Sequence, residues 1–290
     1  MPTIFSFGEL LWDIFPDYKK PGGSPANLAY HLHVLKNRSR LISRIGDDEY
    51  GKELQHFIRK KGLSADYIQT DVKHPTGLVT VQFDDNEPSY TIHEPAAWDF
   101  IEFTQKLGKE ISDADALCFA SLSQRNRASA STLNRLLDSV HPECLTVFDL
   151  NLRPPFIDRK RIMNSIERSK VIKFNMDELN QVSGWFKTDQ FPEYLLRKDP
   201  EKVILLTLGG DGSAMYTRDG YFKQEAFPIT DDGDFVGVGD AFLACITHLL
   251  LKKEDPKQVL LKANRYAASV ASQQGGMPDI PKSVLDDISG

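Results

Sequence analysis

Short apolar runs that are typical of buried strands alternate with amphipathic stretches of helical length along most of this 290-residue chain. The strand-like runs are Thr3–Phe7, Arg40–Arg44, Ala116–Phe119, Leu145–Asp149, Val171–Phe174 and Val203–Leu208. The helical patterns are Tyr50–Lys61, Ala128–Val140, Arg159–Ser169, Gly239–Leu251 and Pro256–Gln273. An alternation of this kind predicts an α/β fold, in which a mostly parallel central sheet carries helices on both faces.

Two segments do not fit this alternation. The first is Leu10–Lys20, and the second, Thr76–His93, has the pattern of a strand, a turn and a second strand. Inserted strands of this kind pair into a small sheet of their own that can cover a pocket, or they extend the edge of the main sheet. We expect one domain over residues 1–290, with a small sheet formed by segments around 10–20 and 76–98.

The composition excludes several classes of protein. The net charge of −6 gives no support for nucleic-acid binding. Cys118, Cys144 and Cys245 each lie in or beside an apolar run and are too scattered for a disulfide framework or a zinc site, which fits a reducing cytoplasm. The chain starts without the pattern of a signal peptide, and its longest apolar run, Ala241–Leu251, is too short to cross a bilayer. We expect a cytoplasmic protein that binds neither membranes nor nucleic acids.

The segment Asp234–Phe242, with the sequence D-F-V-G-V-G-D-A-F, lies at the start of the helical pattern Gly239–Leu251. Glycines at a helix start let backbone N–H groups converge on an anion. An aspartate at that place, here Asp240, can accept a proton from a substrate hydroxyl. An anion site beside a base predicts a phosphotransferase. The competing interpretation is an ordinary loop that ends in a helix N-cap.

This segment resembles the C-terminal signature of the PfkB (ribokinase-like) family of sugar kinases, D-T-x-G-A-G-D-x-F. Phe235 replaces the usual threonine and Val238 the usual alanine. The segment Pro21–Ala29, P-G-G-S-P-A-N-L-A, resembles the N-terminal signature G-G-x-x-x-N and is most similar to fructokinases. The resemblance implies a ribokinase-like fold whose small sheet is a lid that closes over the sugar and often mediates dimerisation.

The resemblance also implies which residues hold the sugar. Asp13 follows the first strand, and Gly23 and Asn27 belong to the N-terminal signature. A carboxylate and an amide suit the recognition of hydroxyl groups. The residues alone leave other roles open, because Asp13 could be a turn residue and Gly23 could lie in a turn before a helix.

Two further sugar-side candidates come from fructokinase-like segments. Trp98 lies in Glu94–Asp99, which resembles a segment that closes over the sugar, so its ring could stack on a sugar face or belong to the core. Arg153 ends the run D-L-N-L-R that begins at Asp149. It could bind a substrate carboxylate or a phosphate, or form a structural ion pair with Asp149.

The nucleotide side is implied by two other segments. The stretch Leu206–Ser213 resembles the T-L-G-x-x-G turn that faces ATP, which makes Thr207, Gly209 and Gly212 candidates. The alternative is a Gly-rich hairpin turn. Asn264 and the pair Gly275–Gly276 fall where family members contact adenine and ribose. For Asn264 the alternative is a polar position on the exposed face of a helix.

Metal sites are also implied. Asn175 and Glu178 match the N-x-x-E motif, which organises Mg²⁺ and phosphate through water. The same spacing predicts a helix start with a capping box, and both interpretations can hold together. Asp234 and the carbonyl of Val236 match positions that bind a monovalent cation, K⁺, in some members of the family.

Taken together, these segments predict an ATP-dependent sugar kinase that is most similar to a fructokinase. Asp240 would be the base, and the N–H groups of Gly237, Val238 and Gly239 would stabilise the transferred phosphoryl group. Alternatives within the family are 2-keto-3-deoxygluconate, which Arg153 could bind, ribose, or a nucleoside. From a different class, the chain could be a catalytically silent sugar sensor on a kinase fold. A P-loop motif and a dinucleotide-binding fingerprint are both absent from the sequence.

Overall fold

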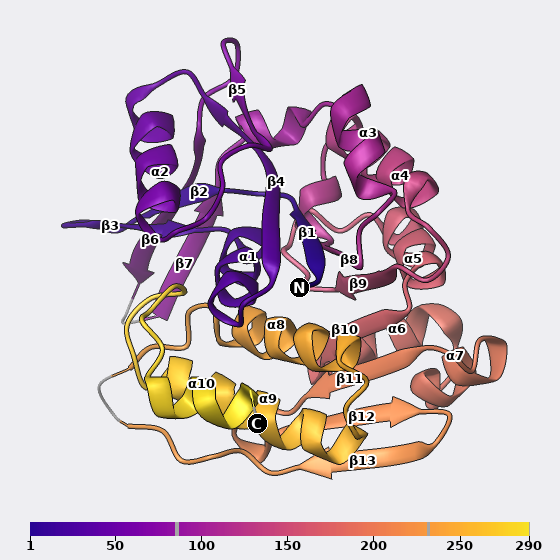
Figure 1. The fold of residues 1–290 in the computed structure, drawn as a ribbon. Coiled ribbons are helices and arrows are strands. Elements are labelled where there is room, and N and C mark those ends of the chain that lie inside the picture. Colours follow the sequence, from indigo (N-terminus) through magenta and orange to yellow (C-terminus); the bar gives the residue numbers. More distant parts are fainter. Residues whose placement is uncertain (85–86, 231–232, 290) are drawn as a thin grey trace.

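The computed structural model describes residues 1–84, 87–230 and 233–289. Its largest element is a nine-stranded sheet with the strand order β13-β12-β11-β10-β9-β8-β1-β4-β5 (Figure 1). These strands are β1 (Thr3–Phe7), β4 (Arg38–Gly46), β5 (Ile68–Asp71), β8 (Ala116–Ala120), β9 (Leu145–Asp149), β10 (Val171–Asn175), β11 (Val203–Thr207), β12 (Ser213–Thr217) and β13 (Gly220–Gln224). The seven neighbouring strands β11, β10, β9, β8, β1, β4 and β5 run parallel, and β12 and β13 extend the sheet antiparallel. The predicted α/β class and its strands are confirmed.

Helices cover both faces of this sheet because successive side chains of each strand point to opposite faces. In β1, Ile4 packs with α1 and α8, whereas Phe5 and Phe7 belong to the core on the other side. The first face carries α1 (Ser24–Val34), α8 (Val238–Leu251) and α9 (Pro256–Ala271), with α10 (Lys282–Ser289) packed on α9. The second carries α3 (Gln105–Ile111), α4 (Arg127–Ser139), α5 (Arg159–Arg168), α6 (Met176–Phe186) and α7 (Phe191–Lys198).

A second, four-stranded sheet stands apart from the main one, on the left of Figure 1. Its order is β3-β2-β6-β7, formed by β2 (Leu11–Ile14), β3 (Lys19–Gly22), β6 (Gly77–Asp84) and β7 (Glu87–Ile92). The predicted inserted strands are therefore a sheet of their own, and their alternative placement at the edge of the main sheet is wrong. Residues 85 and 86, in the predicted hairpin turn, lie outside the described residues. Leu10 and Trp12 pack in a common core with α2 (Glu49–Lys60).

This arrangement brings several chain segments to one edge of the main sheet. Because β9, β10 and β11 are parallel, their last residues, Asp149, Asn175 and Thr207, lie at the same edge. The small sheet begins only a few residues after β1 ends, so it stands beside that edge as well. Over the described ranges, no helix combines the length and the apolar character needed to cross a membrane.

Candidate active site

The helix α8 begins with a turn that only glycine accommodates. Gly237 is its N-cap residue, with a φ of 73° in the left-handed region. A Cβ at Gly237 would come within 2.6 Å of the Cα of Gly276. The first N–H groups of a helix have no partner within it, and the helix dipole places partial positive charge there. The turn of Gly237, Val238 and Gly239 therefore has the conformation expected of an anion-binding site, and we refer to it as the anion-binding turn.

Asp240 lies in the first turn of α8 and is only 8% exposed. The hydroxyl of Ser24 donates to its Oδ1 at 2.5 Å, and Nδ2 of Asn27 donates to its Oδ2 at 2.8 Å. Burial raises the pKa of Asp240 to about 6, while the hydrogen bonds from Ser24 and Asn27 act to lower it. This carboxylate is ionised at neutral pH and retains enough basicity to accept a proton, as a general base must. The sequence placed Ser24 within a signature but predicted no role for it.

Two of the residues predicted to bind the sugar, Asn27 and Asp13, carry acceptor atoms that the described residues leave without a hydrogen bond. Among the described residues, the buried Oδ1 of Asn27 has no hydrogen-bond partner, and no hydrogen bond reaches the carboxylate of Asp13. Burial raises the pKa of Asp13 to about 6, against the charges of Arg153 and Lys20. A Cβ at Gly22 would overlap the Asp13 carboxylate, so the glycine makes room for it. A ligand rich in hydroxyl groups would supply the donors that these acceptors lack.

The glycine at position 23 has a structural reason. Gly23 precedes α1 with a φ of 110°, and a Cβ there would overlap the carbonyl of Glu9. Glu9 itself was not predicted from the sequence as a site residue. It is buried, accepts a hydrogen bond from the Ser123 hydroxyl at 2.9 Å, and has a pKa raised by burial. The signal that could have found it is its place directly after β1, where α/β sheets bind ligands.

For Trp98 and Arg153 the sequence left alternatives open, and the structure rules out one alternative for each. Trp98 is 1% exposed, and the guanidinium of Arg125 lies 3.9 Å from the centre of its ring. Stacking of Trp98 on a sugar is therefore contradicted, and its core alternative is correct. The ion pair of Arg153 with Asp149 is also wrong, because Asp149 forms its ion pair with Lys173 instead. Arg153 is exposed, donates to the carbonyl of Leu152 at 3.4 Å, and lowers the pKa values of Asp13 and Glu9 by its charge.

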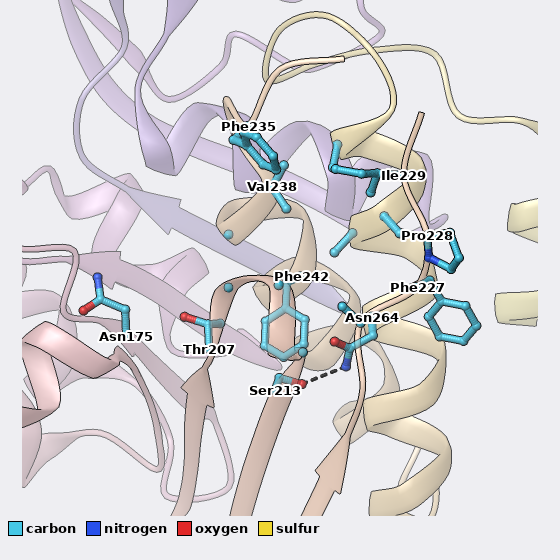
Figure 2. Close-up of a pocket in the computed structure, with 18 residues that line it drawn as sticks. Asn175, Thr207, Ser213, Phe227, Pro228, Ile229, Phe235, Val238, Phe242 and Asn264 are labelled. Carbon is cyan, nitrogen blue, oxygen red and sulfur yellow. Dashed lines mark hydrogen bonds between the residues drawn. The ribbon is translucent and has the colours of Figure 1, made fainter. Parts of the chain in front are cut away.

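Most of the residues predicted to contact the nucleotide line one pocket of about 540 Å³ (Figure 2). Its wall includes polar and glycine positions at Asn175, Thr207, Gly209, Gly212, Gly239 and Asn264, and apolar side chains at Phe227, Pro228, Ile229, Phe235, Val238 and Phe242. Figure 2 shows Phe235 close to Val238 and apart from Thr207. An apolar wall that reaches the positive end of a helix suits a flat base that carries phosphates.

Asn264 and the Gly275–Gly276 pair fall in different places. Asn264 is buried on α9 and donates from Nδ2 to the hydroxyl of Ser213 at 2.7 Å, as the dashed line in Figure 2 shows. Its alternative as an exposed helix position is wrong. Gly276 instead packs against Asn27 on the sugar side, since a Cβ there would come within 2.7 Å of the side-chain amide of Asn27.

A buried lysine that belongs to none of the sequence motifs lies under the anion-binding turn. Lys173 on β10 donates to both oxygens of Asp149, at 2.9 and 3.0 Å, and a Cβ at Gly239 would be 3.4 Å from its Nζ. Burial acts to lower its pKa, but the carboxylates of Asp149 and Glu178 outweigh this effect and the pKa is raised. Lys173 is therefore a charged group beneath the turn. The available signal was one charged residue in the apolar run Val171–Phe174.

Asn175 and Glu178 form the predicted capping box at the start of α6. The Asn175 Oδ1 accepts the Glu178 N–H at 2.8 Å, and Glu178 Oε2 accepts the Asn175 N–H at 2.8 Å. Glu178 Oε1 accepts the N–H of Leu152 at 2.8 Å. Burial, reinforced by Asp149, raises the pKa of Glu178 against the charge of Lys173.

The same residues can be tested for their fit to magnesium. In the described part of the chain, no three His, Cys, Asp or Glu side chains are grouped to hold a metal ion. From the residues that the structure describes, each oxygen of Glu178 accepts a single hydrogen bond, which leaves a lone pair for a water molecule. The site therefore fits magnesium held through its waters and substrate phosphates, and it does not fit a cage of protein ligands.

Asp234 lies just before the anion-binding turn. Its carboxylate accepts the N–H groups of Val236 at 3.1 Å and Gly275 at 3.0 Å. The ammonium of Lys20 lies 3.1 Å from its Oδ2. Asp234, one of the two predicted ligands of a monovalent cation, is thus already in contact with a cationic side chain.

Comparison with known proteins gives one consistent result. Residues 15–283 match the model of the pfkB family carbohydrate kinases. The probable fructokinase-2 of Arabidopsis thaliana is 28% identical, over 96% of this chain and 92% of that protein. A fructokinase from Xylella fastidiosa with bound ATP has the same fold, with a TM-score of 0.88, 22% identity and coverage of 99% of this chain and 98% of that one.

A Vibrio cholerae fructokinase double mutant, in its fructose-, ADP- and potassium-bound form, superposes with a TM-score of 0.82 at 23% identity, covering 99% of this chain and 98% of that one. The fold and the family match over most of the chain agree with one another. This chain belongs to the pfkB family of carbohydrate kinases.

Proposed function

We propose that this carbohydrate kinase transfers the γ-phosphoryl group of ATP to a primary hydroxyl of fructose. One observation carries the proposal: Asp240 connects two sites. Its carboxylate is bound by Ser24 and Asn27 of the sugar side, while its neighbours Val238 and Gly239 line the nucleotide pocket. A base in this position lies between the attacking hydroxyl and the phosphate that it attacks.

Asp240 accepts the proton of the primary hydroxyl as the hydroxyl oxygen attacks the γ-phosphorus and the bond to ADP breaks. The N–H groups of Gly237, Val238 and Gly239 stabilise the charge that develops on the phosphoryl oxygens. Lys173 adds positive charge under the same turn. Glu178 and Asn175 would hold waters of a magnesium ion, which supplies charge neutralisation on the phosphates when it is bound.

The charges around the sugar side favour a neutral substrate. Arg153 is the cation that the sequence predicted for an acidic sugar, but its charge already acts on Asp13 and Glu9. A substrate carboxylate would have to approach both of these acidic groups. Fructose is neutral and offers hydroxyl donors to Asp13 and Asn27. Because Arg153 is exposed and free of an ion pair with Asp149, 2-keto-3-deoxygluconate is the second candidate.

The small sheet is the proposed lid. Its strand β2 carries Asp13, and β3 leads into Gly23 at the start of α1. Closure of this sheet over the sugar would exclude water, which would otherwise compete as phosphoryl acceptor. We place the contact with a second copy of the chain on the same sheet, so that ATP, the sugar and a homodimer partner are the proposed partners.

A release assay for ADP tests the function. Purified protein with Mg-ATP is incubated with fructose, ribose, glucose, 2-keto-3-deoxygluconate or adenosine. We expect turnover with fructose, and a lower kcat/KM with the other compounds. A higher kcat/KM for the acidic sugar would reject fructose in favour of the second candidate. Binding of a sugar without release of ADP would support the sensor interpretation instead.

The pH profile tests the hydrogen bond from Ser24. Because the pKa of Asp240 is about 6, kcat/KM should fall as the pH drops below this value and the carboxylate becomes protonated. The Ser24 hydroxyl stabilises the ionised form, so Ser24→Ala should raise this pKa and move the acid limb of the profile to higher pH. Ser24→Thr keeps the hydroxyl and is the matched control. An unchanged acid limb in Ser24→Ala would show that Ser24 does not act on the base.

A further inference from the structure

A lysine of the small sheet reaches the loop that precedes the anion-binding turn. Lys20 lies on β3, 214 residues away in sequence from Asp234, and its Nζ is 3.1 Å from Asp234 Oδ2. The same Nζ donates to the side-chain carbonyl of Gln274 at 3.3 Å. It also lies 5.6 Å from the ring centre of Tyr18, within the range of a cation–π contact. The two partners of the ion pair are only 27% and 24% exposed, so water screens the pair less than it would a surface pair.

The carboxylate of Asp234 connects Lys20 to the anion-binding turn through the backbone. It accepts the N–H groups of Val236 and Gly275. Directly after these residues come Gly237 and Gly276, which pack against each other closely enough to exclude a Cβ. A shift of Asp234 would therefore move the turn that presents Val238 and Gly239 to the phosphate.

These contacts do not fit a potassium ion at Asp234. A hard cation needs oxygen ligands with free lone pairs. Among the described residues, three donors face this carboxylate, which are the Lys20 ammonium and the N–H groups of Val236 and Gly275, and each carboxylate oxygen already has two contacts with them. An added monovalent cation would be repelled by the charge of Lys20 at short range.

We propose that the Lys20 ammonium is a built-in monovalent cation, which orders Asp234 and the anion-binding turn so that phosphoryl transfer needs Lys20 and no added potassium. The kinetic part of this proposal rests on the proposed function, whereas the part that concerns cation binding at Asp234 does not. Lys20 acts through Asp234 and is thus a positioning residue. The same ammonium also acts on the Asp13 carboxylate, so an effect on sugar affinity alone would have a different origin.

The test compares Lys20→Met with the wild type in potassium chloride and in choline chloride at equal ionic strength. Lys19→Met is the matched control, because Lys19 lies on the same strand and pairs with Glu53 instead. The first readout is the melting temperature of the ligand-free protein. We expect no potassium-specific increase for the wild type or Lys19→Met, and a potassium-specific increase for Lys20→Met, whose Asp234 is free to bind the ion.

The second readout is kcat for sugar phosphorylation. In choline, Lys20→Met should lose about tenfold in kcat, the size expected when one hydrogen bond to a charged group is lost, and potassium should restore part of it. A potassium requirement of the wild type, or full activity of Lys20→Met in choline, would overturn the proposal. A kcat loss that no cation restores, or a rise in sugar KM with unchanged kcat, would do so too. If the wild type phosphorylates none of the sugars, the proposed function fails, while the melting temperatures still decide the cation-binding part.

Discussion

Asp240→Ala is expected to lower kcat by about 10²–10⁴-fold, the usual contribution of a positioned general base. The variant removes the acceptor for the hydroxyl proton and leaves the nucleotide pocket intact, because Asp240 is not among the pocket residues. The KM for ATP should therefore change little. Steady-state kinetics with fructose and Mg-ATP, at a pH above the acid limb, measure the effect.

Asp240→Asn tests whether the side chain acts as a base, separately from its packing between Ser24 and Asn27. It keeps the side-chain volume between Ser24 and Asn27 but cannot accept the proton, so its kcat should be as low as that of Asp240→Ala. Asp138→Asn, at an exposed aspartate of α4, controls for the loss of one negative charge. A value near wild type for either Asp240 variant, with normal thermal unfolding, would reject the general-base role.

The elements of this fold could be predicted from local patterns because burial repeats along the chain with the period of each element. The apolar runs correspond to β1, β4, β8, β9, β10 and β11, and the segment around Asp240 begins a helix at its glycine turn. The family resemblance also predicted Thr207, Gly209 and Asn264 for the nucleotide side, and all three line one pocket. These features depend on residues that are close in sequence or belong to one family signature.

Pairings between distant segments could not be predicted in this way. Whether Arg153 or Lys173 binds Asp149 depends on the register of β9 and β10, which pairs Lys173 with Asp149 and which the composition of the strands does not specify. The contact of Lys20 with Asp234 depends on how the small sheet packs beside the C-terminal loop. Trp98 shows the same limit, because an aromatic residue has the same sequence pattern in a core and in a binding site.

Lys173→Met is expected to lower the free energy of unfolding by about 3–5 kcal/mol, the usual effect of removing one partner of a buried ion pair. The substitution leaves the buried Asp149 carboxylate without its partner and removes the positive charge that also acts on Glu178 and Asp240. Lys173→Met combined with Asp149→Asn removes the unpaired charge and should recover most of the stability. Denaturant unfolding of the two single variants and the double variant measures the coupling.

Catalysis should respond differently from stability in the same variants. The double variant is expected to keep a kcat about 10² lower than wild type, because the ammonium beneath Gly239 is absent when phosphoryl charge develops at the turn. Lys202→Met is the matched control: Lys202 is also buried, but it donates to the carbonyls of Ile166 and Glu167. That variant should lose stability and keep its kcat. If the double variant recovers both stability and kcat, the role of Lys173 is only to neutralise Asp149. A Lys173→Met variant that loses stability but keeps its kcat would lead to the same conclusion.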